Sequence, residues 1–263
     1  MIGRLACAIL ALTTSIRADE AADKLMVSGI ASFSAAFRAW DGERFADSAD
    51  HFGKAVEKDP QSAQALYWQG VALFHRMLWL QHPAQGAPRT KDADAVMETA
   101  IRAFESSVAK DPKNAEAHAL LGTLYGMKIK GGMIAAIRYG PQVREHQQQA
   151  LTCGATNPRV LYLLGAGQLH TAGNPAGRQE ALDSLLAAEK LFAQEAKTAA
   201  RPLAPRWGYS SCLTFIGKAH EALGKPSDAL AYYRKARAMH PADHAAADGI
   251  KRLAGNQADR HER

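Results

Sequence analysis

The chain has 263 residues, of which 47% are hydrophobic and 22% are charged, a composition typical of a folded protein. Its 32 Lys and Arg residues exceed its 26 Asp and Glu residues, so the formal net charge is +6. No run of Lys and Arg occurs anywhere in the chain. Because nucleic-acid binding depends on clustered basic residues, the charge pattern disfavours nucleic acid as a partner.

The first 18 residues have the organisation of an export signal. Residues 1–4 supply a short basic start, residues 5–16 an apolar stretch, and residues 16–18 an acceptable cleavage site. The apolar stretch is too short to span a bilayer, and no later segment is long and apolar enough to do so. We therefore expect a signal peptide over residues 1–18 and a periplasmic or secreted protein that does not span a membrane. The alternative is a surface helix or a frayed terminus.

The clearest pattern in the chain is a unit of 34 residues that begins at Ser210. It places large, small and helix-ending residues at regular intervals: Leu213, Ile216, Gly217, Gly224, Ala229, Tyr233, Ala236 and Pro241. Gly217 and Ala229 are small where two antiparallel helices must approach closely, and Tyr233 fills the space beside them. Pro241 ends the second helix. The spacing predicts a helical hairpin.

This spacing resembles the tetratricopeptide repeat (TPR) family. Two residues depart from the family pattern. His220 stands where Tyr is usual, and Pro226 lies near the start of the second helix, where a proline is tolerated. Each TPR hairpin leaves an apolar face bare, so the resemblance implies that the hairpins stack on one another.

Four further units of unequal quality precede the clearest one. Three of them end like the last unit, with an Asp, Asn or His followed by proline: Asp59-Pro60, Asp111-Pro112 and Asn157-Pro158, beside His240-Pro241. We predict an all-α protein, a right-handed α-solenoid of about five TPR-like hairpins, over residues 19–254. The expected units lie near residues 29–62, 63–114, 115–157, 158–197 and 210–243, followed by a capping helix at 245–253. Residues 255–263 are polar and are expected to be disordered.

Two insertions interrupt the repeats. The 52 residues from Pro60 to Pro112 exceed one repeat by 18, and the 46 from Pro112 to Pro158 exceed it by 12. The second insertion, residues 131–141, is apolar between glycines and a proline, whereas a spacer would be polar. We expect it to pack back onto the array. Together with the Asn157-Pro158-Arg159 and Trp207-Gly208 elements, it is similar to certain exported bacterial TPR proteins of unassigned role.

In TPR arrays the first helix of each hairpin lines a concave groove. The resemblance carries the groove positions onto five bulky or charged residues that we expect to contact a ligand: Tyr67, His75, Tyr162, His170 and Lys218. Glu116 and Arg159 occupy groove positions as well. This mixture of aromatic rings, histidines and charges suits a peptide or a small amphipathic ligand. The alternative is that these side chains pack beneath the two insertions and that Lys218 and Glu221 form a surface pair.

The sequence contains no recognisable motif for metal binding, catalysis or cofactor binding. No Cys pair or His-Glu-x-x-His spacing indicates a metal, and no nucleophile motif or phosphate loop indicates catalysis or a cofactor. Cys153 is placed at a core-facing position and Cys212 at the start of a helix about two repeats away, so both are expected to be free thiols.

We therefore expect a non-catalytic scaffold or adaptor of the bacterial cell envelope that binds a protein or peptide in its groove. The alternative is a small-molecule-binding accessory protein of a transport system, with residues 131–141 closing a cavity. The oligomeric state stays open.

Overall fold

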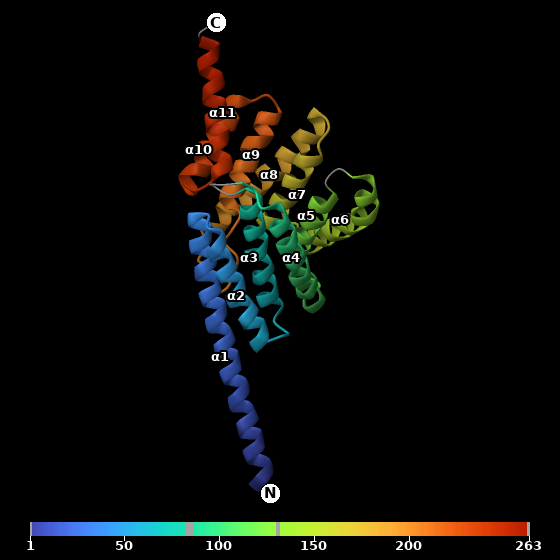
Figure 1. Ribbon diagram of the computed structural model, residues 1–263, viewed down its shortest axis with the longest axis vertical. Coiled ribbons are helices and arrows are strands. Elements are labelled where there is room, and N and C mark those ends of the chain that lie inside the picture. The colour runs from blue at the N-terminus through green and yellow to red at the C-terminus, as the bar shows by residue number, and fades with distance from the viewer. Residues whose placement is uncertain (1, 83–86, 130–131, 262–263) are drawn as a thin grey trace. The chain divides into compact units, whose positions relative to one another are not determined.

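The computed structural model describes residues 2–82, 87–129 and 132–261 (Figure 1), and their side chains are described from residue 20 to residue 255. In these ranges all regular secondary structure is α-helical. The helices are α1 (Ile2–Ala39), α2 (Gly42–Lys58), α3 (Ala63–Gln81), α4 (Thr90–Lys110), α5 (Ala115–Ile129), α6 (Met133–Gly154), α7 (Pro158–Thr171), α8 (Pro175–Glu195), α9 (Tyr209–Ala222), α10 (Pro226–Met239) and α11 (His244–His261).

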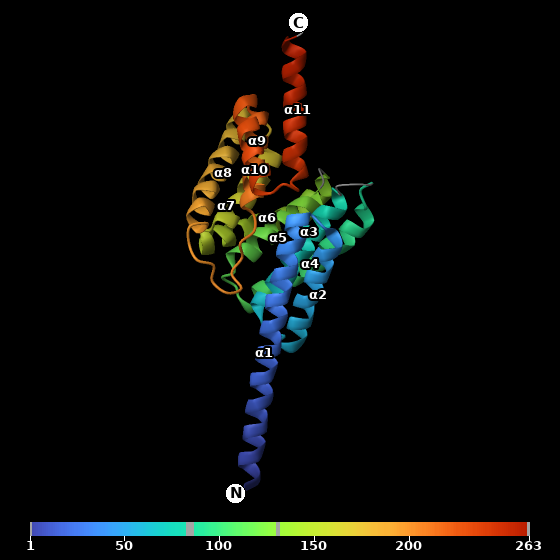
Figure 2. The same ribbon diagram turned by 90° about the vertical axis from the view of Figure 1, so that its left-hand side faces the viewer.

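The chain divides into two compact units, Met1–Pro112 and Lys113–Arg263. The first holds the hairpins α1–α2 and α3–α4, and the second holds α5–α6, α7–α8 and α9–α10 with α11 packed on the last pair. Figures 1 and 2 show α7 to α10 lying side by side within the second unit. The all-α fold of stacked TPR-type hairpins with a C-terminal capping helix is confirmed.

Polar side chains fix the starts of several helices. Asp41, Ser62, Asn157 and Asn174 each accept a hydrogen bond from a backbone amide two or three residues further along the chain. Pro226 is the first residue of α10, a position where the missing amide of proline costs no helical hydrogen bond. The local sequence therefore sets where these hairpins begin.

Within the hairpins, a residue without a side chain on one helix faces a ring on the other. A Cβ added to Gly70 would lie 2.6 Å from the ring of Phe104, and one added to Gly217 would lie 2.6 Å from the ring of Tyr233. Both rings are fully buried. The close helix approach predicted from the spacing of Gly217 and Tyr233 is confirmed.

The second insertion packs back onto the array only at its end, where the ring of Tyr139 stacks on that of Tyr125 of α5. Residues 130–131 lie outside the described residues, and the rest of the segment lies in the first turns of α6. There, Met133, Ile134 and Ile137 are 78%, 83% and 73% exposed. For these three residues the expectation of packing is wrong, because the start of α6 lies beyond the last residue of α5 in the register of the hairpin.

The register of the α5–α6 hairpin explains this exposure. Gly122 faces Gln147, and the ammonium of Lys128 lies 4.8 Å from the ring centroid of Tyr139. Extending this antiparallel register places Ile129, the last residue of α5, beside Arg138. The residues of α6 before Arg138 therefore project past the end of α5.

Cys153 is exposed, so its predicted core-facing position is wrong, whereas Cys212 is buried and its thiol contacts the carbonyl of Leu185. Gly154, the next residue, makes the close approach to Ala115 instead, which turns Cys153 outward. Both thiols are free. Burial raises the pKa of the Cys212 thiol above its usual range.

The terminal helices differ from the boundaries expected from the sequence. Helix α1 includes the backbone of residues 2–18, and their removal as a signal peptide stays a prediction. Helix α11 continues to His261, past the expected end of the cap at residue 253, because no proline interrupts a stretch that contains good helix formers. In the described part of the chain, no helix combines the length and the apolarity needed to cross a membrane.

Candidate functional site

Tyr67, on α3 of the first unit, is a core residue. It is 4% exposed, and its ring centroid lies 5.8 Å from that of Trp68 and 6.3 Å from that of Phe104 on α4. These contacts hold α3 against its hairpin partner. The structure therefore places Tyr67 in the interior of the first unit.

His75, also on α3, lies inside a cluster of aromatic rings. It is 4% exposed, and its ring centroid is 5.0 Å from that of Phe33 and 5.6 Å from that of Phe37, both on α1. Its Nδ1 atom is 2.8 Å from the carbonyl oxygen of Val71. A buried imidazole with a backbone partner and aromatic neighbours serves the packing of α1 on α3.

The other three predicted residues meet in the second unit, around Phe215. Tyr162 and His170 lie on α7, and their ring centroids are 5.8 Å and 5.7 Å from that of Phe215 on α9. Lys218 follows Phe215 by one helical turn, with its Nζ 4.6 Å from the centroid of the Phe215 ring. We call Tyr162, His170, Phe215 and Lys218 the Phe215 cluster.

Exposure differs among the members of the Phe215 cluster. Tyr162 is buried, Phe215 and Lys218 are half-buried, and His170 is exposed. Burial raises the pKa of the Tyr162 hydroxyl above its usual range, so this group stays neutral. The cluster thus offers an aromatic floor, one histidine that reaches solvent and one lysine at its edge.

Lys218 is the cationic residue of the Phe215 cluster, and its charge affects its neighbour His170. Burial lowers the pKa of its ammonium, because removal from water disfavours the charged form. Partial burial also lowers the pKa of His170, and the nearby charge of Lys218 lowers it further.

The carboxylates of Asp243 and Glu221, whose charges raise the pKa of Lys218, form hydrogen bonds with other groups. Asp243 accepts a hydrogen bond of 2.6 Å from the Thr214 hydroxyl. Glu221 accepts hydrogen bonds from Arg252 at 2.7 and 2.8 Å and from the Tyr233 hydroxyl at 2.8 Å. Within the described residues Lys218 forms no ion pair, and the surface pair of Lys218 with Glu221 considered from the sequence is not formed.

Two of the residues predicted at groove positions form a buried ion pair instead. Glu116 on α5 and Arg159 on α7 are 7% and 5% exposed, and the Nε of Arg159 donates to Glu116 at 2.8 Å. Arg159 also donates to Glu195 at 3.0 Å and to the carbonyl of Trp207 at 3.3 Å. This network joins α5, α7, the end of α8 and the connector before α9, so it stabilises the unit.

The family of the chain follows from a comparison with family models. The model described as "Regulator of microtubule dynamics protein 1-3" matches residues 79–254, more than half of the chain. The chain belongs to this family. A second model, described as "Tetratricopeptide repeat", matches residues 33–77, which confirms the TPR resemblance. No curated protein matches the chain.

Two solved structures are similar to this chain in fold. A thermophilic TPR protein of Thermus thermophilus, TTC0263, is 18% identical with a TM-score of 0.59, over 89% of this chain and 98% of that one. The APC/C hetero-tetramer Cut9-Hcn1 gives 12% identity and a TM-score of 0.59, over 92% of this chain and 40% of that one. At these identities the likeness shows the fold alone.

Phe215 is the residue of the cluster that the repeat pattern missed. It does not occupy a groove position of the TPR consensus, yet it lies three residues before Lys218 and so shares its helix face. The pairing of Glu116 with Arg159 was also missed. Its signal was a pair of opposite charges at the same position of adjacent repeats.

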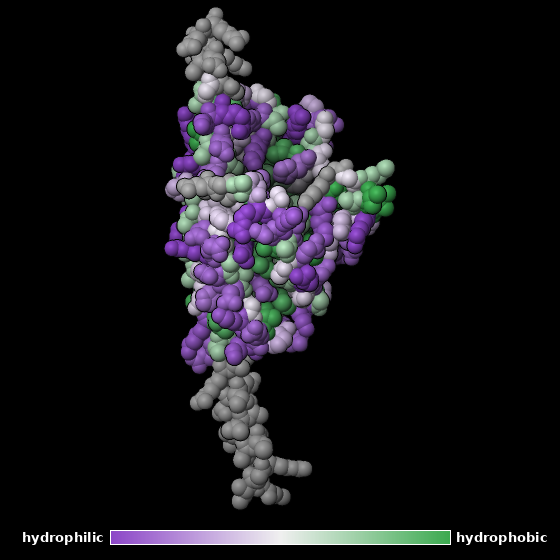
Figure 3. Space-filling view, in the orientation of Figure 1, coloured by the Kyte–Doolittle hydropathy of each residue, from purple (hydrophilic) through white to green (hydrophobic). Residues whose placement is uncertain are grey.

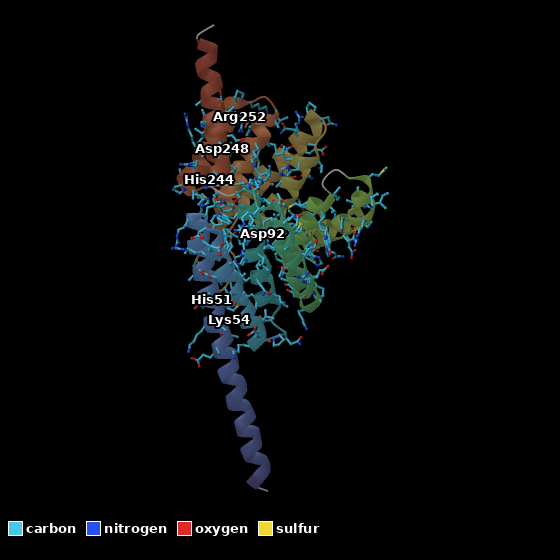
Figure 4. The ribbon with its side chains drawn as sticks, in the orientation of Figure 1. His51, Lys54, Asp92, His244, Asp248 and Arg252 are labelled. Atoms are coloured by element: carbon cyan, nitrogen blue, oxygen red, sulfur yellow. The ribbon has the colours of Figure 1, made fainter. Side chains whose placement is uncertain are left out.

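One further ion pair joins α9 to the C-terminal helix α11. Figure 4 labels His244, Asp248 and Arg252 on successive turns of α11, and Arg252 pairs with Glu221 of α9. Among the residues that the structure describes, no group of three His, Cys, Asp or Glu side chains could hold a metal ion.

Proposed function

We propose that this chain is a non-catalytic, peptide-binding TPR scaffold and that the Phe215 cluster is the contact site for its ligand. The observation that carries the proposal is Lys218, a half-buried cation that lies beside an aromatic ring and forms no ion pair among the described residues. A desolvated cation is stabilised when an anionic group binds next to it. The TPR fold of the chain supports a role in protein interaction.

The geometry of the cluster specifies the chemistry of the ligand. Phe215 and the exposed ring of His170 present apolar and aromatic surface, and Lys218 presents one positive charge at its edge. A complementary peptide has an apolar or aromatic side chain with one carboxylate close to it. A long acidic segment is a poorer match, because the cluster contains a single half-buried lysine.

The test compares peptide binding by two lysine variants of the full chain. Short peptides with one aromatic residue and a free carboxylate are assayed by fluorescence anisotropy, beside the same peptides with the carboxylate amidated and a poly-glutamate peptide. Lys218→Met keeps the aliphatic stem and removes the charge, and Lys190→Met, at an exposed position of α8, is the matched control. We expect Lys218→Met to weaken binding about tenfold, which corresponds to more than about 1 kcal/mol.

Amidation should weaken binding to the unmodified chain by a similar factor and should have no further effect on Lys218→Met. Equal binding by Lys218→Met and Lys190→Met would contradict the proposal, as would preference for poly-glutamate. The small-molecule alternative is less well supported, because Met133, Ile134 and Ile137 of the apolar segment expected to close a cavity are exposed on α6.

We also propose that the scaffold acts in the bacterial cell envelope. The support is the basic start, apolar stretch and cleavage motif in residues 1–18. The expected result is a mature protein whose first residue is Asp19, determined by N-terminal sequencing of protein isolated from the source organism. Recovery of a chain that retains Met1 would overturn this location.

A further inference from the structure

The first turns of α6 expose a concentration of apolar side chains. Met133, Ile134 and Ile137 are the three most exposed large hydrophobic residues of the described chain. Figure 3 shows a strongly hydrophobic patch at the outer edge of α6. We call the segment Met133–Ile137 the α6 tip. Burying three such side chains is favourable wherever a suitable apolar environment is available.

Helical spacing places the apolar side chains of the α6 tip on one side. Met133 and Ile137 are one turn apart, and Ile134 is adjacent to Met133, so the three lie within about a third of the helix circumference. The tip projects past the end of α5, and α6 as a whole buries only Ala150 among its described residues. The apolar side chains are therefore on a projecting end.

Positive charge surrounds the α6 tip. Residues 117–144 contain no Asp or Glu and include Lys128, Arg138 and Arg144 among the described residues, and the first carboxylate after them is the exposed Glu145. Arg138 and Arg144 are exposed. The Nη1 atom of Arg144 lies 3.7 Å from the position that a Cβ on Gly140 would take, so the arginine side chain points back toward the tip. Arg144 is seven residues from Ile137, or about 10 Å along α6, with Pro141 of the same helix between them.

An anionic lipid surface matches both features of the α6 tip. Acyl chains accept exposed Met and Ile side chains, and lipid phosphates pair with the two exposed arginines that lie behind them. Long basic side chains keep their charged ends at the headgroup level while their stems contact apolar material. A separation of about 10 Å between Ile137 and Arg144 suits this arrangement, with the tip in the acyl boundary and the cation among headgroups.

A second copy of the chain is a poorer match. Each tip has Lys128, Arg138 and Arg144 nearby and one close carboxylate, Glu145, so two tips brought together would oppose net positive charge with net positive charge, which disfavours association. We propose that the α6 tip inserts into an anionic lipid surface and docks the protein on it peripherally. This docking is separate from peptide binding at the Phe215 cluster.

The test measures binding of the full chain to vesicles of phosphatidylcholine alone and of phosphatidylcholine with about one third phosphatidylserine. The tip variant is Met133→Ser, Ile134→Ser and Ile137→Ser together. Its matched control replaces the other three exposed large hydrophobic residues, as Val27→Ser, Leu151→Ser and Met239→Ser. All proteins share the same N-terminal stretch, so differences in co-sedimentation report on the substituted residues.

We expect the unmodified chain to bind anionic vesicles at least tenfold more tightly than neutral ones. The tip variant should lose at least tenfold in affinity for anionic vesicles, while the control should lose less than twofold. Arg138→Gln with Arg144→Gln should weaken binding to anionic vesicles alone and reduce its salt dependence, in comparison with Arg234→Gln and Lys251→Gln.

A probe at the tip shows the depth of insertion directly. An environment-sensitive fluorophore on Ile134→Cys, in a chain with Cys7→Ser and Cys153→Ser, should shift to shorter wavelength on anionic vesicles, and the same label on Met239→Cys should not. Equal vesicle binding by the tip variant and its control, or an unshifted label at position 134, would overturn the proposal. A dimer that dissociates only in the tip variant, measured by analytical ultracentrifugation, would overturn it in favour of self-association.

Discussion

Replacing Tyr233 with alanine is expected to lower the free energy of unfolding of the second unit by about 3 to 5 kcal/mol. The ring is fully buried, with one edge against Gly217 of α9 and the other against Gly249 of α11. Its hydroxyl donates a hydrogen bond of 2.8 Å to Glu221, and burial raises its pKa above the usual range. Removal of the ring leaves a cavity bounded by three helices.

The measurement is denaturant unfolding followed by circular dichroism, with hydrogen exchange to assign the loss to the second unit. Tyr232→Ala is the matched control, because the neighbouring tyrosine is half-buried on the same helix. Tyr233→Phe keeps the ring and removes the hydrogen bond to Glu221, which should cost about 1 kcal/mol. A loss for Tyr233→Ala no larger than that for Tyr232→Ala would show that the ring does not hold the cap.

Replacing Arg159 with methionine is expected to cost about 3 to 5 kcal/mol, because Glu116 is left buried with its charge unpaired. The side chains of Arg159 and Glu116 are 6% and 9% exposed, so solvent cannot replace the lost partner. The variant also removes donors from Glu195 and from the carbonyl of Trp207. The connector between α8 and α9 should therefore exchange its amide hydrogens faster.

A double variant distinguishes the cost of the unpaired Glu116 charge from the cost of the lost hydrogen bonds. Glu116→Met with Arg159→Met replaces both charges by apolar side chains, which should recover a large share of the stability lost in Arg159→Met. Arg178→Met is the control, since this arginine on α8 makes one exposed hydrogen bond to the carbonyl of Ala222. A double variant as unstable as Arg159→Met would show that the hydrogen bonds, and not the unpaired Glu116 charge, decide the loss.

Local patterns predicted the hairpins well, because their determinants lie close together in sequence. Gly217 and Tyr233 are separated by 16 residues and meet across one turn, so their spacing is sufficient to predict the contact. Pro226 begins a helix and Pro241 follows the end of one for reasons confined to the backbone. The family resemblance was equally visible, since it depends on the same residues.

The candidate site was predicted less completely, because exposure depends on residues from other hairpins. His75 and His170 were both predicted to contact a ligand because they occupy the same position of their repeats. Phe33 and Phe37 of α1 cover His75, whereas His170 stays exposed beside Phe215. The repeat pattern did not predict that the rings of α1 contact α3. It therefore could not show that His75 is buried while His170 is exposed.

The sequence by itself determined which segments are helical, which helices pair as hairpins and which family the chain resembles, since these properties depend on spacings within a repeat. Only the tertiary structure decided which side chains remain exposed to solvent and which residues they lie beside. Met133 and Ile137 are exposed because α5 ends at Ile129, and Lys218 lies beside the aromatic cluster because α7 brings Tyr162 and His170 to Phe215. Both outcomes depend on where a neighbouring helix ends or passes, and that is a property of packing between elements.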